Sequence, residues 1–307
     1  MPVRAVKRIA VVGAGPAGLA AATVAAERGH QVTLFDGAGE IGGQFNVAKR
    51  VPGKEEFFET LRYFRNKLNS TGVDLRLNTR VDVQALVEGG FDEVILATGI
   101  APRTPAIPGV EHAKVLSYLD VLLERKPVGK AVAVIGAGGI GFDVSEYLVH
   151  QGVASSQDRE AFWKEWGIDT QLEARGGVAG VKAVPHAPAR QVYLLQRKQS
   201  KVGDGLGKTT GWIHRAGLKN KHVQMLNSVE YLGIDDAGLH IRVGDGEPQL
   251  LAVDNVVICA GQEPLRELHE GLLAAGQSVH LIGGADVAAE LDAKRAINQG
   301  SRLAAEL

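Results

Sequence analysis

Residues 8–19 read Arg8-Ile-Ala-Val-Val-Gly-Ala-Gly-Pro-Ala-Gly-Leu19, an apolar run that leads directly into spaced glycines. The run predicts a buried strand, and Pro16 is typical of the first turn of a helix. Gly13 permits a tight turn, Gly15 has no Cβ to hold a pyrophosphate away, and Gly18 lets the helix pack close to the strand. The stretch therefore predicts a phosphate-binding strand–turn–helix unit, and a tight turn without a ligand is the alternative.

The residues that follow complete this unit. An alanine-rich helix is predicted over 19–28, Gly29 ends it, and a second strand over 31–35 is followed by Asp36. Asp36 comes 18 residues after Gly18, near the place where dinucleotide folds have the carboxylate that accepts hydrogen bonds from a ribose diol. The glycine-rich residues 37–44 then favour a backbone that lies beneath a flavin nucleotide, with a surface loop as the alternative.

Later segments add candidate residues to the same site. A buried strand over 92–99 ends in small residues, which suits a strand end that faces a ligand, and an apolar strand from 279 ends in two glycines and an acid. We assign this last strand and a helix over 288–303 to the first domain. The candidate cofactor residues outside the first turn are Ala17, Asp36, Gly43, Gln44, Val81, Ala97, Thr98, Gly99, Gly284 and Asp286.

Residues 130–141 repeat the opening stretch 123 positions later. They have the same strand, glycine spacing and helix start, and the candidate residues are Gly136, Gly138, Gly139, Ile140 and Gly141. Two copies are much stronger evidence than one. The sequence therefore predicts an α/β fold with two Rossmann-like dinucleotide-binding domains, the second inserted into the first. Residues 1–120 plus 260–307 form the first domain, and residues 121–259 form the second.

The second copy differs from the first after its helix. The next strand, 191–195, follows an insertion at about 151–189, for which a small packed excursion is favoured over a lid. At the end of this strand Arg197 and Lys198 replace the acid, and a cationic pair suits the 2′-phosphate of NADPH better than the free diol of NADH. A solvated basic turn is the alternative. His214 is a candidate proton donor, although an ordinary packed histidine is the favoured interpretation.

Composition excludes several other classes of function. The formal charge of −1, from 34 basic and 35 acidic residues, gives no reason to expect nucleic acid or an anionic membrane as a partner. No apolar run reaches the ~20 residues of a membrane span, and residues 1–8 are too short for a secretory signal, so we expect a cytoplasmic location. Cys259 is the single cysteine, so the chain predicts no internal disulfide, iron–sulfur cluster or other metal site.

Longer segments resemble one family closely. The chain is similar, over essentially its whole length, to the carboxy-terminal half of bacterial NADPH-dependent 2,4-dienoyl-CoA reductases, within the two-dinucleotide flavoprotein class. The segments that carry this resemblance are 32–36, 40–46, 51–57, 115–121, 206–215 and 253–264. Leu265 departs from the family pattern, which usually has Asn after Gln-Glu-Pro.

The resemblance implies FAD in the first domain and NADPH in the second. The implied FAD contacts include Gly15, Ala17, Asp36, Gln44 and Val81, and the implied 2′-phosphate contacts are Arg197 and Lys198. The family's FMN barrel and its cysteines for a four-iron cluster are absent from this sequence. The chain is therefore expected to act as an electron-input half, together with the missing FMN and iron–sulfur half or a separate electron acceptor.

Two hypotheses from different classes follow. In the first, the chain is a FAD-dependent NADPH:acceptor oxidoreductase, incomplete alone, in which a hydride passes from NADPH to the flavin. Such a transfer depends on placement and electrostatic tuning, so no side chain is predicted to be catalytic. In the second, the chain is a non-catalytic docking domain that holds ADP or another nucleotide.

Overall fold

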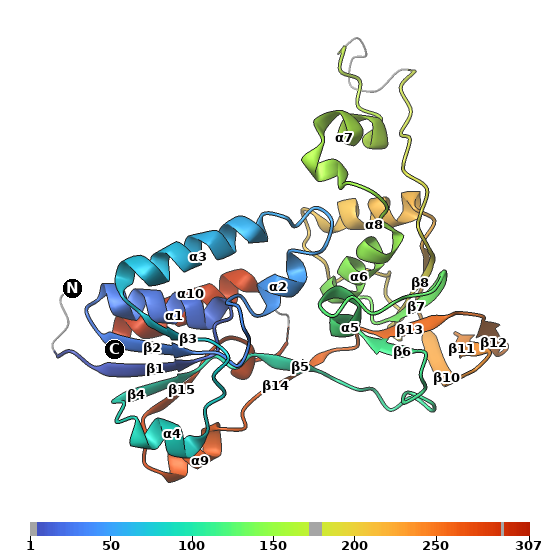
Figure 1. Ribbon diagram of the computed structural model, residues 1–307. Coiled ribbons are helices and arrows are strands. Elements are labelled where there is room, and N and C mark those ends of the chain that lie inside the picture. The colour runs from blue at the N-terminus through green and yellow to red at the C-terminus, as the bar shows by residue number, and fades with distance from the viewer. Residues whose placement is uncertain (1–4, 172–179, 290–291) are drawn as a thin grey trace. The chain divides into compact units, whose positions relative to one another are not determined.

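The computed structural model describes residues 5–171, 180–289 and 292–307, and the chain divides into two compact units (Figure 1). Unit 1 comprises Met1–Ala48, Glu56–Ala101 and Gln262–Leu307. Unit 2 comprises Lys49–Glu55 and Pro102–Gly261.

Unit 1 is built on a five-stranded sheet in the order β15-β4-β1-β2-β3, and its neighbouring strands pair in parallel. The apolar residues of β1 alternate between two cores, because successive side chains of a strand point to opposite faces. Ile9 and Val11 belong to one core, and Ala10 and Val12 belong to the other. The strands are β1 (Arg8–Val12), β2 (Gln31–Phe35), β3 (Asp74–Arg76), β4 (Glu93–Leu96) and β15 (Val279–Leu281).

Helices cover both faces of this sheet (Figure 1). One face carries α1 (Pro16–Glu27), α3 (Phe57–Thr71) and α10 (Ala293–Glu306), and the other carries α4 (Val83–Glu88) and α9 (His269–Ala274). The remaining short elements are α2 (Gln44–Ala48), η2 (Gly283–Ala285), and the paired strands β5 (Ile100–Pro102) and β14 (Gln262–Pro264). The helix predicted over 288–303 is α10, which packs on α1 so closely that an ideal Cβ at Gly300 would lie 2.3 Å from the carbonyl oxygen of Ala17.

Unit 2 repeats the parallel arrangement, with a sheet in the order β6-β13-β7-β8-β9. Its strands are β6 (Val115–Ser117), β7 (Ala131–Ile135), β8 (Gln191–Leu195), β9 (Gln224–Leu226) and β13 (Asn255–Ile258). The contacting helices α5 (Tyr118–Leu122), α6 (Gly139–Val149) and α8 (Gly211–Asn220) complete its main body. Both units therefore have the mixed α/β architecture with parallel sheets that is typical of Rossmann-like FAD- and NAD-binding domains.

An antiparallel sheet packs against the parallel sheet of unit 2. It consists of β10 (Val229–Asp235), β11 (Gly238–Val243) and β12 (Gln249–Leu251). Ile241 of this sheet shares a buried core with Ile135 and Ile258 of the parallel sheet. The alternating apolar residues between 239 and 253 therefore form an antiparallel hairpin of β11 and β12.

The two compact units begin and end at other residues than the predicted domains. The first segment of the predicted first domain ends at residue 120, whereas β6 pairs with β13 and the chain enters unit 2 at Pro102. Ala260 and Gly261 also belong to unit 2, because the carbonyl oxygens of both accept hydrogen bonds from Arg103. Residues 49–55, assigned to the first domain from the sequence, belong to unit 2 through the ion pair of Lys54 with Asp143.

The insertion of unit 2 contains η1 (Ser155–Gln157) and α7 (Arg159–Trp166), while its residues 172–179 lie outside the described residues. Asp158 accepts hydrogen bonds from the N–H groups of Glu160 and Ala161 and caps α7. Glu165 forms an ion pair of 3.5 Å with Lys221, and only 12% and 11% of these side chains are exposed. The described part of the insertion is therefore anchored to the main body of unit 2.

Within the described ranges, no helix combines the length and the apolar composition needed to span a membrane.

Candidate dinucleotide-binding sites

The glycine turn of unit 1 contains two glycines that the fold itself requires. Gly13 has a φ of +109°, and an ideal Cβ there would lie 2.3 Å from the carbonyl oxygen of Ala97. An ideal Cβ at Gly18 would lie 1.8 Å from the carbonyl oxygen of Gly13. Both positions exclude a side chain for reasons internal to the protein, so neither one is evidence for a ligand.

Gly15 is different, because nothing in the fold requires glycine there. Its φ of −79° and ψ of −176° suit any residue, and the nearest atom to an ideal Cβ is the Cα of Gly43 at 3.9 Å. It is the N-cap residue of α1, so it lies beside the free N–H groups of the helix start. A bare backbone here fits a group that approaches the turn closely, as a phosphate does.

The loop predicted to lie beneath a flavin nucleotide does reach this turn. The N–H of Gly42 donates to the carbonyl oxygen of Ala14 at 2.8 Å, and an ideal Cβ at Gly43 would lie 3.0 Å from the Cα of Gly15. Gly43 has a φ of +50° and is exposed, and Gln44 follows it as the first residue of α2.

The second glycine turn also contains two glycines that the fold requires and one that it does not. Gly136 has a φ of +111°, and its ideal Cβ would lie 2.4 Å from the carbonyl oxygen of Cys259. An ideal Cβ at Gly141 would lie 1.7 Å from the carbonyl oxygen of Gly136. Gly138, the N-cap of α6, has a φ of −83° and no atom within 4 Å of its ideal Cβ. Gly138 and Gly139 are exposed, so this turn also presents bare backbone to its surroundings.

Asp36 directly follows β2, and its side chain stabilises the first glycine turn. One carboxylate oxygen accepts from the N–H of Ala14 at 2.6 Å, and the other accepts from the N–H of Ala38 at 2.7 Å. A carboxylate oxygen has more than one acceptor position, so Asp36 retains the capacity to accept from a ribose hydroxyl.

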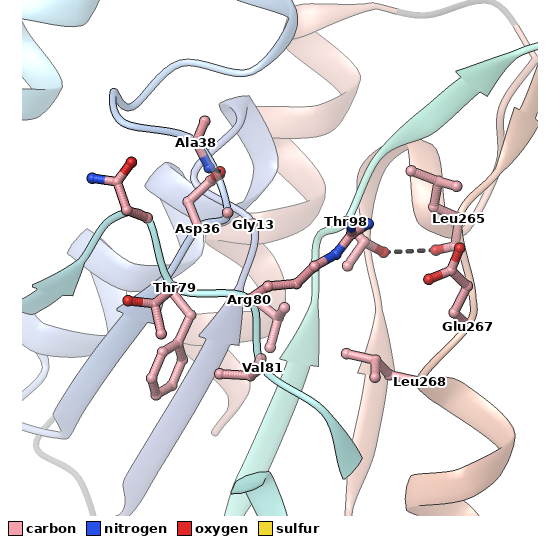
Figure 2. Close-up of a pocket in the computed structure, with 14 residues that line it drawn as sticks. Gly13, Asp36, Ala38, Thr79, Arg80, Val81, Thr98, Leu265, Glu267 and Leu268 are labelled. Carbon is pink, nitrogen blue, oxygen red and sulfur yellow. Dashed lines mark hydrogen bonds between the residues drawn. The ribbon is translucent and has the colours of Figure 1, made fainter.

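A cavity of about 540 Å³ in unit 1 brings part of the predicted site together (Figure 2). Its wall includes the predicted residues Gly13, Asp36, Val81 and Thr98. The predicted residues Gly15, Gly43, Gln44, Gly284 and Asp286 do not line it. The full lining is Val12, Gly13, Phe35, Asp36, Gly37, Ala38, Asn78, Thr79, Arg80, Val81, Thr98, Leu265, Glu267 and Leu268.

The small residues after β4 connect this cavity to the C-terminal part of unit 1. Ala97 is buried against Gly13, and the hydroxyl of Thr98 donates to the carbonyl oxygen of Leu265 at 2.6 Å. Gly284 lies so close to Gly99 that an ideal Cβ would be 3.1 Å from the carbonyl carbon of Gly99.

Asp286 is held by side chains of unit 1. One of its carboxylate oxygens accepts from the amide of Gln299 at 2.7 Å, and its backbone carbonyl accepts from the guanidinium of Arg266. Its carboxylate therefore retains acceptor positions for an outside donor.

Gln196 of unit 2 occupies the position that Asp36 has in unit 1. The N–H of Gln196 donates to Leu226 and its carbonyl accepts from Val229, as those of Asp36 do with Arg76 and Thr79. The amide of Gln196 donates to the carbonyl oxygens of Lys198 and Ser200, and so shapes the loop after β8. Arg197 and Lys198 are exposed on this loop, as a binding role would require.

A charged cluster surrounds α6, the helix that follows the second turn, and of its members only His214 was a candidate from the sequence. Lys54 donates to Asp143 of α6 at 2.7 Å, and Nδ1 of His214 on α8 lies 3.6 Å from Oε2 of Glu146. Burial raises the pKa of Asp143 despite the nearby ammonium of Lys54. The Glu146 carboxylate raises the pKa of His214, which favours a protonated imidazole.

The family model described as pyridine nucleotide-disulphide oxidoreductase matches residues 7–291. The chain belongs to this family. It is therefore a flavoprotein oxidoreductase module of a family whose members bind FAD and a pyridine nucleotide. The chain's one cysteine, Cys259, is buried, which raises the pKa of its thiol, and it cannot form a disulfide within the chain.

Curated relatives are oxidoreductases and are considerably longer. A metal reductase of Desulforamulus reducens is 29% identical over 282 residues, which are 91% of this chain and 41% of that protein. An NADH oxidase of Thermoanaerobacter brockii is 38% identical over 288 residues, which are 91% of this chain and 38% of that protein. This chain thus spans well under half the length of either relative.

Solved structures support the fold. A 2-naphthoyl-CoA reductase complex has a TM-score of 0.82 at 23% identity, and the match covers 100% of this chain and 40% of that chain. A thioredoxin reductase of T. acidophilum has a TM-score of 0.66 at 17% identity, with 98% of each chain covered. At these identities the likeness concerns the fold alone.

Proposed function

We propose that this chain is an electron-input module that takes a hydride from NADPH onto FAD and passes electrons onward, as in the corresponding half of 2,4-dienoyl-CoA reductase. In this proposal unit 1 is the FAD domain and unit 2 is the NADPH domain, inserted between the sequence segments of unit 1. The electrons go to an FMN and iron–sulfur half or to a separate acceptor.

The observation that carries the proposal is the space at Gly15 and Gly138. Neither glycine has a strained backbone, and an alanine methyl group would contact nothing closer than 3.9 Å at either position. Each caps a helix that follows a parallel strand. A ligand whose phosphates approach the backbone accounts for glycine at both positions, and a purely structural turn does not.

Residues of unit 1 would contact successive parts of FAD. The N–H groups at Gly15 and Ala17 would donate to the diphosphate, the carboxylate of Asp36 would accept from the adenosine ribose, and Val81 would contact the adenine. The residues Gly43, Gln44, Gly284 and Asp286 would contact the flavin side. Bound FAD supplies an acceptor for a hydride that can release electrons one at a time.

The proposed preference for NADPH rests on the end of β8. The position equivalent to Asp36 holds Gln196, whose amide is engaged with the loop backbone, so no carboxylate is available there for a free ribose diol. Arg197 and Lys198 are exposed beside it and would pair with the 2′-phosphate.

The first experiment is a visible spectrum of the purified chain reconstituted with FAD, followed by anaerobic mixing with NADPH. We expect flavin absorbance near ~450 nm that is bleached on mixing. A sample that retains its FAD and is not bleached by either NADPH or NADH would contradict the proposed reaction.

A second candidate function is a docking domain that holds only ADP in unit 1. The observation in its favour is that the cavity collects Asp36 and Val81 from the adenosine end, while Gln44 and Asp286 from the flavin end do not line it. The same spectrum separates the two functions once unbound FAD has been removed, because a docking domain of this kind would bind ADP and would retain no flavin absorbance.

A further inference from the structure

Charged side chains are unevenly distributed around the cavity of unit 1. Among the residues that the structure describes, its wall contains two acids, Asp36 and Glu267, and one base, Arg80. A nucleoside diphosphate would bring further negative charge into this cavity. Arg80 is then the one lining side chain that attracts such a ligand by its charge, while Glu267 repels it.

Most other polar side chains of the wall are already engaged. The Asp36 carboxylate accepts from two backbone N–H groups, the Thr79 hydroxyl donates to Leu77, and the Thr98 hydroxyl donates to Leu265. Across the described ranges, no hydrogen bond or ion pair engages the guanidinium of Arg80 or the carboxylate of Glu267. These two groups are therefore free to respond to a ligand.

The two groups come from opposite walls. Arg80 lies on the segment between β3 and α4 and extends across the cavity toward the side of Thr98 and Leu265, where Glu267 also lies (Figure 2). Thr98 is next to the glycine turn, since its backbone nitrogen would be 3.2 Å from an ideal Cβ at Gly13. The arginine thus reaches from the predicted adenine position toward the turn proposed to hold the diphosphate.

We propose that Arg80 and Glu267 together set the affinity of unit 1 for the adenosine diphosphate part of its cofactor, with Arg80 strengthening binding and Glu267 weakening it. The inference rests on the proposed function in that it takes the ligand of this cavity to be a nucleoside diphosphate. It assigns opposite effects on affinity to two residues of one cavity, which a general loss of structure cannot mimic.

The test is a titration of the cofactor-free full chain with FAD, read by flavin fluorescence. Arg80→Gln should raise the Kd for FAD about tenfold at low salt, and less at 1 M salt, where the Debye length falls to about 3 Å. Arg80→Lys should stay within about threefold of the parent chain, because it keeps the charge. Glu267→Gln should lower the Kd about threefold, because it removes a repulsion.

Two controls accompany these variants. Arg302→Gln changes an exposed arginine of α10 outside the cavity and should leave the Kd unchanged. ADP as a competitor of FAD should show the same dependence on Arg80 and Glu267 as FAD, whereas FMN, which lacks the adenosine part, should not.

Several results would overturn the inference. These are an unchanged Kd in Arg80→Gln, a shift in the same direction for Arg80→Gln and Glu267→Gln, or an Arg80→Lys variant as weak as Arg80→Gln. If FAD binds normally and neither residue matters, the inference fails and the proposed function stands. If FAD does not bind but direct titration with ADP shows both effects, the proposed function fails and the inference stands.

Discussion

Replacing Gly15 with alanine separates ligand binding from folding. An alanine methyl group has space in the structure, with the nearest atom 3.9 Å from its ideal position, and the backbone angles are ordinary for alanine. The same methyl group would stand between the helix start and any phosphate that approaches it. Gly15→Ala should therefore leave the cofactor-free protein folded and strongly weaken its binding of FAD.

The expected effect of Gly15→Ala on stability is much smaller than its expected effect on FAD affinity. Alanine is a poorer N-cap residue than glycine by about 0.5–1 kcal/mol. Alanine also reduces the conformational entropy of the unfolded chain, which stabilises the folded protein by a similar amount. The free energy of unfolding should therefore change by less than about 1 kcal/mol. Loss of one or two charge-assisted hydrogen bonds to phosphate costs about 2–4 kcal/mol, which raises the Kd about 30- to 800-fold.

Gly138→Ala is the matched variant of unit 2, because its ideal Cβ also has no neighbour within 4 Å. Urea unfolding of the cofactor-free variants, followed by circular dichroism, measures stability. Flavin fluorescence measures FAD binding, and nicotinamide fluorescence measures NADPH binding. Gly15→Ala should lose FAD and keep NADPH, whereas Gly138→Ala should do the reverse.

Two results would refute this reasoning. A loss of several kcal/mol of stability in Gly15→Ala would mean that the turn requires glycine for the fold. Unchanged affinity for both cofactors in both variants would mean that neither turn binds phosphate.

Three further predictions concern other residues. Gly18→Ala should cost at least about 3 kcal/mol of unfolding free energy, because its Cβ would lie 1.8 Å from a carbonyl oxygen, and a variant as stable in urea as the parent would contradict this. Arg197→Ala should weaken NADPH about tenfold more than NADH in parallel titrations, and equal losses would exclude a 2′-phosphate role. Burial alone would raise the pKa of Glu93, but hydrogen bonds from Lys7, Ser278 and His280 outweigh it and lower the pKa to about 2. The stabilisation by the Glu93 carboxylate is therefore complete above pH 4.5 and is lost as the pH falls toward 2. Glu93→Gln should destabilise the protein by about 2 kcal/mol at pH 7 and should weaken the fall of its unfolding free energy between pH 4.5 and 2, measured in urea. An unchanged fall at acid pH would contradict the assignment.

Much of the fold could be predicted from the sequence because the deciding signals are local. A run of apolar residues and a glycine that must adopt a positive φ lie within one stretch of chain, and both glycine turns form where this pattern occurs. At the first turn Pro16 also marks the helix start. The strand from Val279 was harder to assign to a domain from the sequence, because its short apolar run fits either sheet. Its parallel pairing with β4 assigns it to unit 1.

The candidate site was predicted only in part. Arg80 and Glu267 line one cavity although they lie far apart in the sequence, and neither belongs to a recognisable motif. The ion pair of Lys54 and Asp143 joins residues 89 positions apart. No periodicity or spacing connects such residues, because the packing of whole elements brings them together.

The sequence by itself therefore determined the two strand–turn–helix units and their candidate phosphate contacts, since backbone conformation and burial of a short segment depend on its own residues. The tertiary structure alone decided which glycines are required by the fold and which leave space for a ligand. It also decided where one unit ends and the other begins, and which charges share a cavity. Those properties depend on distances between atoms that the chain brings close only after it has folded.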